Sequence, residues 1–272
     1  MKLLLDAGNT RVKLSWMASG ADARADEIAV FGYDDLPALT EWVAALPGKP
    51  EAAWGASVVD EARMAALEAA ASAAAGQALP MHWLAGRERA AGVRNAYDPA
   101  HRLGPDRWAG LLGLAWHERR LAAAERGPVL LASFGTATTL DALLPLADDA
   151  SCDYAFPGGL ILPGVALMAR SLAQGTARLP DEPGGLHAFP TQTRDAIATG
   201  VAAAQAGAVW RQWRQLGRQA GGAPARLYVT GGAWPLVELE LRQWFEPASI
   251  VWLAAPALDG LACLAHTMPD GG

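Results

Sequence analysis

Between two apolar stretches near its start the chain reads DAGNTRVK, which is Asp6, Ala7, Gly8, Asn9, Thr10, Arg11, Val12 and Lys13. Glycine followed by asparagine is a strong signal for a tight turn, because both residues tolerate a positive φ. The apolar stretches at residues 2–6 and 12–17 are therefore expected to pair as a β-hairpin. A third strand is expected at residues 27–31.

This hairpin carries side chains suited to a phosphate group. A glycine turn lets the backbone approach an anion, Asn9 and Thr10 can donate hydrogen bonds, and Lys13 can supply positive charge. Asp6 can hold a magnesium ion and its waters. A plain turn with a solvated lysine is the alternative, but Asp6 follows three leucines, and an unpaired carboxylate at the end of a core strand is costly.

The same order of features starts again in the middle of the chain. After the break Arg-Gly-Pro at residues 126–128, apolar runs at 129–134 and 138–143 flank Gly135 in the stretch FGTATTLDA. Thr136 beside that glycine could meet outer phosphates from the opposite side of a nucleotide. A threonine-rich strand is also ordinary in β structure, so this motif is informative only beside the first hairpin.

The repeat predicts a duplicated α/β architecture with a cleft between the two halves. We expect a first domain at residues 1–125 and a second at 126–272, in which residues 155–162 would be the third strand. A single doubly wound sheet is the competing architecture. Helices are expected at residues 36–46, 61–75, 107–124, 165–174 and 193–216, and further strands at 52–59, 81–84, 227–230 and 250–253.

A third motif is YDPAHRLGPDRW at residues 97–108. Gly104 and Pro105 force a loop, which puts Asp106 at or just before the start of the next helix. A carboxylate there can accept a hydroxyl proton, and Arg107 offers a planar fork to a substrate carboxylate. An aspartate before a helix is also a common N-cap, which is the purely structural alternative.

Composition narrows the class of protein. The net charge is -6 over 272 residues with both signs interleaved, so the basic stripe that nucleic acid needs is missing and we expect no such partner. Cys152 and Cys263 are too few for a disulfide framework, which favours reduced thiols in the cytoplasm. No apolar segment reaches the roughly 20 residues of a membrane span, so no membrane partner is expected.

Six stretches carry a resemblance to a known family: DAGNTRVK, YDPAHRLGPDRW, FGTATTLDA, PGGLILPG, TRDAIATG and VTGG. In this order the chain resembles the type III pantothenate kinases, which include the Bvg accessory factor proteins, over nearly its whole length. The resemblance implies two actin-like (ribonuclease H-like) ATPase domains with an interdomain cleft. It also implies that ATP with Mg²⁺ phosphorylates pantothenate to 4'-phosphopantothenate, the first step of coenzyme A biosynthesis.

The same resemblance implies roles for individual residues. The stretch from Asp6 to Lys13 would line the ATP phosphates together with Thr136, and Asp106 would accept the proton. Pantothenate would be contacted by Tyr97, Gly104, Pro105, Asp106 and Arg107. The family completes its site across a homodimer, and the matching position is Thr193 of the partner subunit, with Thr191 of the partner subunit as the alternative.

One position departs from the family pattern. The family usually has an aspartate two residues before the glycine of its GTA motif, where it helps to bind a monovalent cation, and here that position is Ser133. A hydroxyl is neutral and a weaker ligand than a carboxylate. A K⁺ or NH₄⁺ ion is therefore expected, but at an altered site.

Two other functions fit parts of the pattern. A noncatalytic actin-like protein that binds nucleotide as a regulatory switch is possible because fold does not fix function. A kinase of another small alcohol is the second alternative. Asp106 and Arg107 beside a complete phosphate hairpin favour an enzyme.

Overall fold

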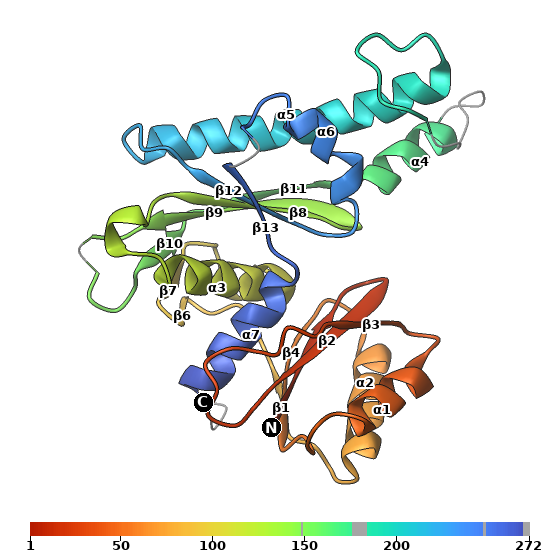
Figure 1. The fold of residues 1–272 in the computed structure, drawn as a ribbon, viewed down its shortest axis with the longest axis vertical. Coiled ribbons are helices and arrows are strands. Elements are labelled where there is room, and N and C mark those ends of the chain that lie inside the picture. The colour runs from red at the N-terminus through yellow and green to blue at the C-terminus, as the bar shows by residue number, and fades with distance from the viewer. Residues whose placement is uncertain (148, 176–183, 247–248, 269–272) are drawn as a thin grey trace. The chain divides into compact units, whose positions relative to one another are not determined.

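The computed structural model describes residues 1–147, 149–175, 184–246 and 249–268. The chain divides into two compact units, each built on a mixed sheet of its own (Figure 1). Unit 1 comprises Met1–Arg126, Leu146–Phe156 and Ala255–Gly272, and unit 2 comprises Gly127–Pro145 and Pro157–Ala254.

The main sheet of unit 1 has five strands in the order β3-β2-β1-β4-β5. β1 pairs antiparallel with β2 and parallel with β4, as expected of a hairpin followed by a crossover. The expected hairpin is thus confirmed. The strands are β1 (Lys2–Ala7), β2 (Arg11–Met17), β3 (Ala29–Gly32), β4 (Ala52–Ser57) and β5 (Met81–Trp83).

One face of this sheet is covered by α1 (Leu36–Ala44) and α2 (Glu61–Ala75), as Figure 1 shows. Leu3 and Leu5 of β1 are buried against Leu39 of α1 and Leu67 of α2. The alternation of a strand then directs the intervening residues of β1 to the opposite face. α2 starts at its N-cap Asp60, whose side chain accepts a hydrogen bond from the backbone of Arg63 at 2.9 Å.

α3 (Pro105–Arg119) and α7 (Pro256–Thr267) pack against each other very closely. A β-carbon added at Gly113 would overlap the carbonyl oxygen of Pro256, and one added at Gly260 would overlap the carbonyl oxygen of Ala109. Only glycine permits this approach of two helix backbones. α7 also contacts β1 and β4, so this pair of helices supports the main sheet of unit 1.

Unit 1 also contains three neighbouring strands in the order β10-β7-β6, and they correct one sequence-based expectation. Residues 155–162 were expected to form one strand, but they divide between β10 (Tyr154–Phe156) and β11 (Gly159–Pro163). Gly158 between them has a φ of +132°, which turns the chain. β10 pairs parallel with β7, so only β11 is the third strand of the second half. The short elements are β6 (Arg89–Ala90), β7 (Val93–Asn95), η1 (Ala100–Arg102) and η2 (Ala123–Glu125).

The sheet of unit 2 repeats the order of the first. β8 pairs antiparallel with β9 and parallel with β12, β11 pairs antiparallel with β9, and β13 pairs parallel with β12. Across the sheet the order is β11-β9-β8-β12-β13. Among these five strands, this is the third, second, first, fourth and fifth along the chain, as in unit 1. The chain therefore has the duplicated actin-like architecture that we expected. The remaining strands are β8 (Val129–Phe134), β9 (Ala137–Pro145), β12 (Arg226–Thr230) and β13 (Ile250–Trp252).

A long helix covers one face of this second sheet. α5 (Thr193–Gln219) buries Ala206, Val209 and Leu216 in a core with β8, β9 and β12. The aromatic residues Trp210, Trp213 and Phe245 lie within 5.3 Å of one another by ring centroids and close the core beneath α6. The other helices of unit 2 are α4 (Val165–Gly175), η3 (Trp234–Leu236) and α6 (Glu238–Leu241).

The units differ from the expected domains 1–125 and 126–272 at Arg126, which belongs to unit 1, and in two longer segments. Residues 146–156 and 255–272 belong to unit 1, because β10 pairs with β7 and α7 packs on α3. Of the helices in the described part of the chain, none combines the length and apolarity that a membrane crossing requires.

Candidate active site

The Asp6 hairpin presents two charged side chains on one face of the main sheet of unit 1. Asp6 in β1 lies directly opposite Lys13 in β2. Both lie on the face away from α1 and α2, because the neighbouring residues Leu5 and Ala7 are buried in the core on the other side. The turn between the strands is closed by the Gly8 N–H, which donates to the Arg11 carbonyl at 3.1 Å. Asn9 and Thr10 are exposed at the tip of the turn.

The start of α3 presents a second carboxylate. Gly104 is the N-cap and Pro105 the first helical residue, where the fixed φ of proline suits a helix and its missing N–H is not needed. Asp106 lies in the first turn, and its Oδ1 accepts a hydrogen bond from the Arg107 backbone N–H at 2.8 Å. Asp106 is therefore inside the helix, while the N-cap role falls to Gly104.

Asp6, Lys13 and Asp106 form one electrostatic cluster. Burial raises the pKa of Asp6 to about 6, the positive charge of Lys13 opposes this rise, and the negative charge of Asp106 adds to it. These three residues come from strand β1, strand β2 and helix α3, so the fold brings together the first and third sequence motifs. Two carboxylates and one ammonium group are a donor set that can receive a metal ion together with the phosphates it binds.

The donor set fits magnesium better than a tightly coordinated transition metal. Within the described ranges no group of three or more His, Cys, Asp or Glu side chains could hold a metal ion. Magnesium usually keeps several waters and uses one or two carboxylates plus substrate phosphates. Asp6 is the carboxylate that would hold it, through water.

Arg107 lies in an aromatic setting beside this cluster. Its guanidinium carbon is 5.7 Å from the ring centroid of Tyr97 and 5.9 Å from that of Phe156, and the two rings are stacked. Arg107 is 8% exposed. A buried guanidinium beside two aromatic rings is favourable for recognising a carboxylate, because the rings stabilise the cation and limit competition from water.

The loop that carries Tyr97 is held by Asn95, a residue that sequence reasoning missed. The Asn95 side chain accepts a hydrogen bond from the Tyr97 backbone at 2.9 Å and donates to the carbonyls of Arg87 at 3.1 Å and Ala100 at 3.2 Å. Asn95 is buried. Its position before the motif YDPAHRLGPDRW is a signal of a loop-stabilising side chain that could have been noticed.

The hairpin of unit 2 has a different environment. Thr136 and Gly135 are exposed in the turn between β8 and β9. Gly164 lies so close that a β-carbon there would overlap the carbonyl oxygen of Gly135, and one at Gly231 would overlap that of Phe134. Two further glycines therefore pack closely against the backbone at this turn.

Ser133 lies in a row of hydroxyl groups within unit 2. It is paired with Thr139 of β9 and with Thr230 of β12, so the three side chains share one face of the sheet. The Thr230 hydroxyl is buried and has no hydrogen-bond partner within the described residues. Asp141 lies two residues beyond Thr139 on the same face and is buried.

Thr191 and Thr193 are exposed at the start of α5, whose N-cap is Gln192. Neither residue is in the clusters described above for unit 1. Their proposed role concerns a second copy of the chain.

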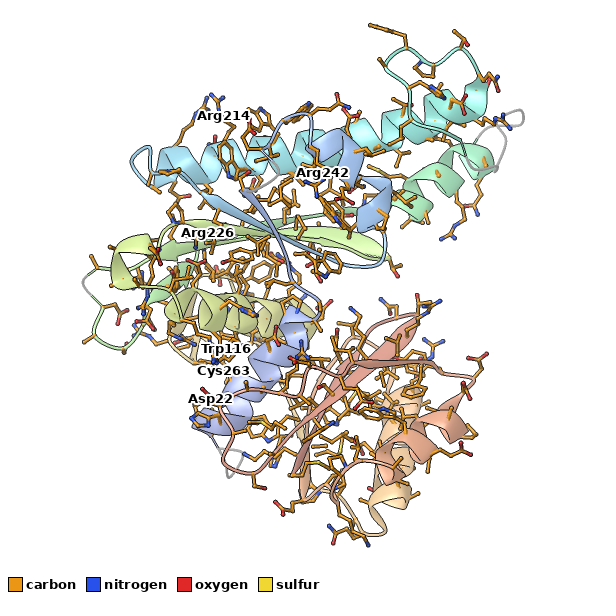
Figure 2. The ribbon with its side chains drawn as sticks, viewed as in Figure 1. Asp22, Trp116, Arg214, Arg226, Arg242 and Cys263 are labelled. Atoms are coloured by element: carbon orange, nitrogen blue, oxygen red, sulfur yellow. The ribbon has the colours of Figure 1, made fainter. Side chains whose placement is uncertain are left out.

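One hollow of unit 1 lies at the other end of α3. It has a volume of about 420 Å³ and is lined by residues that include Asp22, Trp116, Arg119 and Cys263, three of which Figure 2 labels. Trp116 and Arg119 are at the C-terminal end of α3, about 15 and 20 Å along the helix from Asp106 at 1.5 Å per residue. This hollow is therefore separate from the cluster around Asp6.

Comparison with known proteins gives a consistent result. The sequence model of the type III pantothenate kinase family matches residues 2–215. The chain is 44% identical to a type III pantothenate kinase of Bordetella petrii, covering 99% of this chain and 98% of that protein. It is 40% identical to one of Chromobacterium violaceum, covering 98% and 100%.

A solved structure is similar in fold. A protein of Campylobacter jejuni, described as a Baf family transcriptional activator, is 19% identical to this chain with a TM-score of 0.54. The match covers 98% of this chain and 99% of that one. At this identity the likeness concerns the fold alone.

The raised pKa of Asp6 predicts a pH-dependent effect of the Asp6→Asn substitution on stability. The carboxyl group has a pKa of about 6 in the fold against 3.8 as its ordinary value, so the folded state binds the extra proton between these values. Stability contributed by the neutral form is then lost as pH rises through about 6. We expect Asp6→Asn to stabilise the protein on the order of 2 kcal/mol at pH 8 and to have little effect at pH 4.

Urea denaturation of both proteins between pH 4 and pH 8 would measure this difference. Asp26→Asn, which changes an exposed carboxylate, is the control and should leave the free energy of unfolding nearly unchanged. An Asp6→Asn protein that is no more stable than the wild type at pH 8 would contradict the interpretation.

Proposed function

Because the chain belongs to the type III pantothenate kinase family, we propose that the Asp6 cluster is its catalytic centre. The family activity is the phosphorylation of pantothenate in coenzyme A biosynthesis, and the chain is a kinase that uses ATP for this reaction. The observation that carries the residue assignment is the electrostatic coupling of Asp6 to Lys13 and Asp106. The roles of individual residues below belong to this proposal.

The ATP phosphates bind at the hairpin of residues 6–13. Lys13 supplies positive charge, and the tip of the turn at Asn9 and Thr10 supplies hydrogen-bond donors. Magnesium held by Asp6 through water would neutralise charge on the phosphates during transfer. Thr136 in the turn of the second hairpin contacts the phosphates of the same nucleotide. Each of the two turns is exposed and therefore open to a ligand.

Pantothenate binds beside the start of α3. Its carboxylate is recognised by Arg107, supported by the Tyr97 and Phe156 rings that flank the guanidinium. Gly104 and Pro105 border this position, and Gly104 allows close approach because a β-carbon there would come within 2.8 Å of Asp106 Oδ1. The pantothenate hydroxyl then faces the Asp106 carboxylate.

Asp106 orients this hydroxyl and accepts its proton. The hydroxyl oxygen forms a bond to the γ-phosphorus while the bond from that phosphorus to the bridging oxygen of ADP breaks. The transition state of phosphoryl transfer is loose, so the proton can leave late and positioning contributes most of the acceleration. A carboxylate in the first turn of a helix is well held for this purpose, because the helix dipole stabilises its charge.

A homodimer completes the site. Unit 2 exposes large apolar side chains on β11, on α4 and before α5, and we name Ile161, Leu167 and Phe189 together the α4 surface. Phe189 is 93% exposed. Burial of such groups favours association. Thr193 of the partner subunit would reach pantothenate, and Thr191 of the partner subunit is the alternative.

A monovalent cation, K⁺ or NH₄⁺, binds near Ser133. The hydroxyl row of Ser133, Thr139 and Thr230 offers oxygen ligands, and the unpartnered Thr230 hydroxyl supports a ligand there. These groups are neutral, so binding is weaker than at a carboxylate.

The protein acts in the cytoplasm, in keeping with two free cysteines in unit 1. A noncatalytic nucleotide switch and a kinase of another small alcohol are the rival functions of this fold. ADP release from ATP and Mg²⁺ with pantothenate, compared with a panel of sugars, separates them. ADP release with a sugar but not with pantothenate would overturn the assignment.

Asp106→Asn is expected to lower turnover on the order of 10² to 10⁴ fold, because the amide cannot accept the hydroxyl proton. Binding of ATP should remain nearly intact. Steady-state kinetics of ADP release and calorimetric titration with ATP would measure the two effects. Turnover equal to that of the wild type would refute the role of Asp106.

Ser133→Asp is expected to restore a stronger cation site. Activity as a function of KCl or NH₄Cl concentration should then reach half of its maximum at a lower salt concentration than in the wild type. NaCl at equal ionic strength is the control for screening. Identical activation curves for the two proteins would count against a cation at this position.

Leu167→Glu is expected to weaken the homodimer, because it places a charge in the α4 surface. Sedimentation velocity should give a dimer for the wild type and a shift toward monomer for the variant. Leu239→Glu is a matched control, since Leu239 is 65% exposed on α6, which is not one of the elements of the α4 surface. A monomeric wild type would overturn the dimer proposal.

A further inference from the structure

We propose that Tyr33 and Arg63 are positioning residues that hold the Gly8 turn in the conformation that binds the ATP phosphates. This inference rests on the proposed role of the Asp6 hairpin. Neither residue belongs to the motif DAGNTRVK: Tyr33 follows β3, and Arg63 is in the first turn of α2. Both nevertheless reach the backbone of the turn.

Tyr33 fixes the first peptide group of the turn. Its hydroxyl donates a hydrogen bond to the Gly8 carbonyl oxygen at 2.6 Å. A trans peptide group is planar, so the N–H of the next residue points away from that carbonyl. The Tyr33 hydrogen bond therefore directs the Asn9 N–H to the side of the turn opposite Tyr33.

Arg63 acts on the next peptide group. Its Nη1 donates to the Asn9 carbonyl oxygen at 3.4 Å, which directs the Thr10 N–H away from Arg63 by the same geometry. The Arg63 guanidinium also lies over the Tyr33 ring, 5.0 Å from its centroid. Because the two donors lie against each other, the carbonyls of Gly8 and Asn9 both point to the same side of the turn.

The two peptide groups then present their N–H groups in a common direction. Successive backbone N–H groups that converge make a concave site for an anion. In free solution such a turn would sample other peptide orientations, and ordering it on binding would weaken affinity. Tyr33 and Arg63 order the turn in advance.

Tyr33 keeps its proton at the pH of an assay. Burial raises the pKa of Tyr33 to about 12, a rise that the positive charge of Arg63 opposes and that Asp6 and Asp60 support. Arg63 is anchored by Asp60, which accepts from its backbone N–H at 2.9 Å and lies 3.9 Å from its Nε. The effect of removing the Tyr33 hydroxyl should therefore be constant between pH 6 and pH 9.

The test compares Tyr33→Phe and Arg63→Gln with the wild type by calorimetric titration. Each substitution should raise the Kd of MgATP about three- to tenfold, the range expected from one hydrogen bond to a peptide carbonyl. Adenosine, which has no phosphates, should bind as before. In kinetics, KM for ATP should rise while kcat and KM for pantothenate stay within about twofold.

Two controls make the result specific. Arg214→Gln removes an arginine from the outer side of α5, where Figure 2 labels it. This substitution should change neither the Kd of MgATP nor the Kd of adenosine. Arg63→Lys keeps a donor and should restore part of the ATP affinity. A loss of adenosine binding equal to the loss of ATP binding would indicate a general structural role and overturn the proposal.

Lys13→Met separates this inference from the proposed function. If Lys13→Met weakens ATP binding while Tyr33→Phe and Arg63→Gln do not, the positioning role is wrong and the phosphate hairpin stands. If none of the three weakens ATP binding, the hairpin assignment fails and the positioning role fails with it.

Discussion

A carboxylate held at the end of a core strand is the constraint around which unit 1 is arranged. Asp6 follows three fully buried leucines, and its burial raises its pKa to about 6. Such a group destabilises the fold unless it is charge-paired or neutral. The charge of Lys13 lowers the pKa of Asp6, and the charge of Asp106 raises it. The protein thus tolerates an unfavourable cluster that a metal ion with phosphates would relieve, as is common where catalytic groups converge.

Local signals were sufficient for most of the secondary structure. The Gly8-Asn9 turn and the apolar runs beside it act over a few residues, and the hairpin and the duplicated α/β architecture were predicted from signals of this kind. The third strand of the second half was not predicted correctly, because residues 155–162 divide between β10 and β11. Alternation cannot distinguish one strand from two when Gly158 turns the chain within an apolar run. The membership of α7 in unit 1 depends on contacts between residues far apart in sequence, which no local pattern carries.

The candidate site shows the same limit. Sequence motifs identified Asp6, Lys13 and Asp106 separately, and their order resembled a known family, but their proximity follows from the placement of α3 against the sheet. Tyr33 and Arg63 lay outside every motif, because their role is to contact backbone atoms of the turn and any suitable donor could serve. Residues that contact only peptide groups are therefore difficult to identify from sequence motifs.

The contact of Gly113 with α7 also has a consequence for synthesis. α7 comes after all the elements of unit 2, yet it packs on α3 and β1 of unit 1. During translation the second unit can fold as its strands emerge. The first unit cannot complete its packing until α7 has been synthesised. A chain interrupted before Gly260 would hold a formed second unit and an unfinished first unit. The glycine contact therefore makes enzymatic competence depend on nearly complete translation.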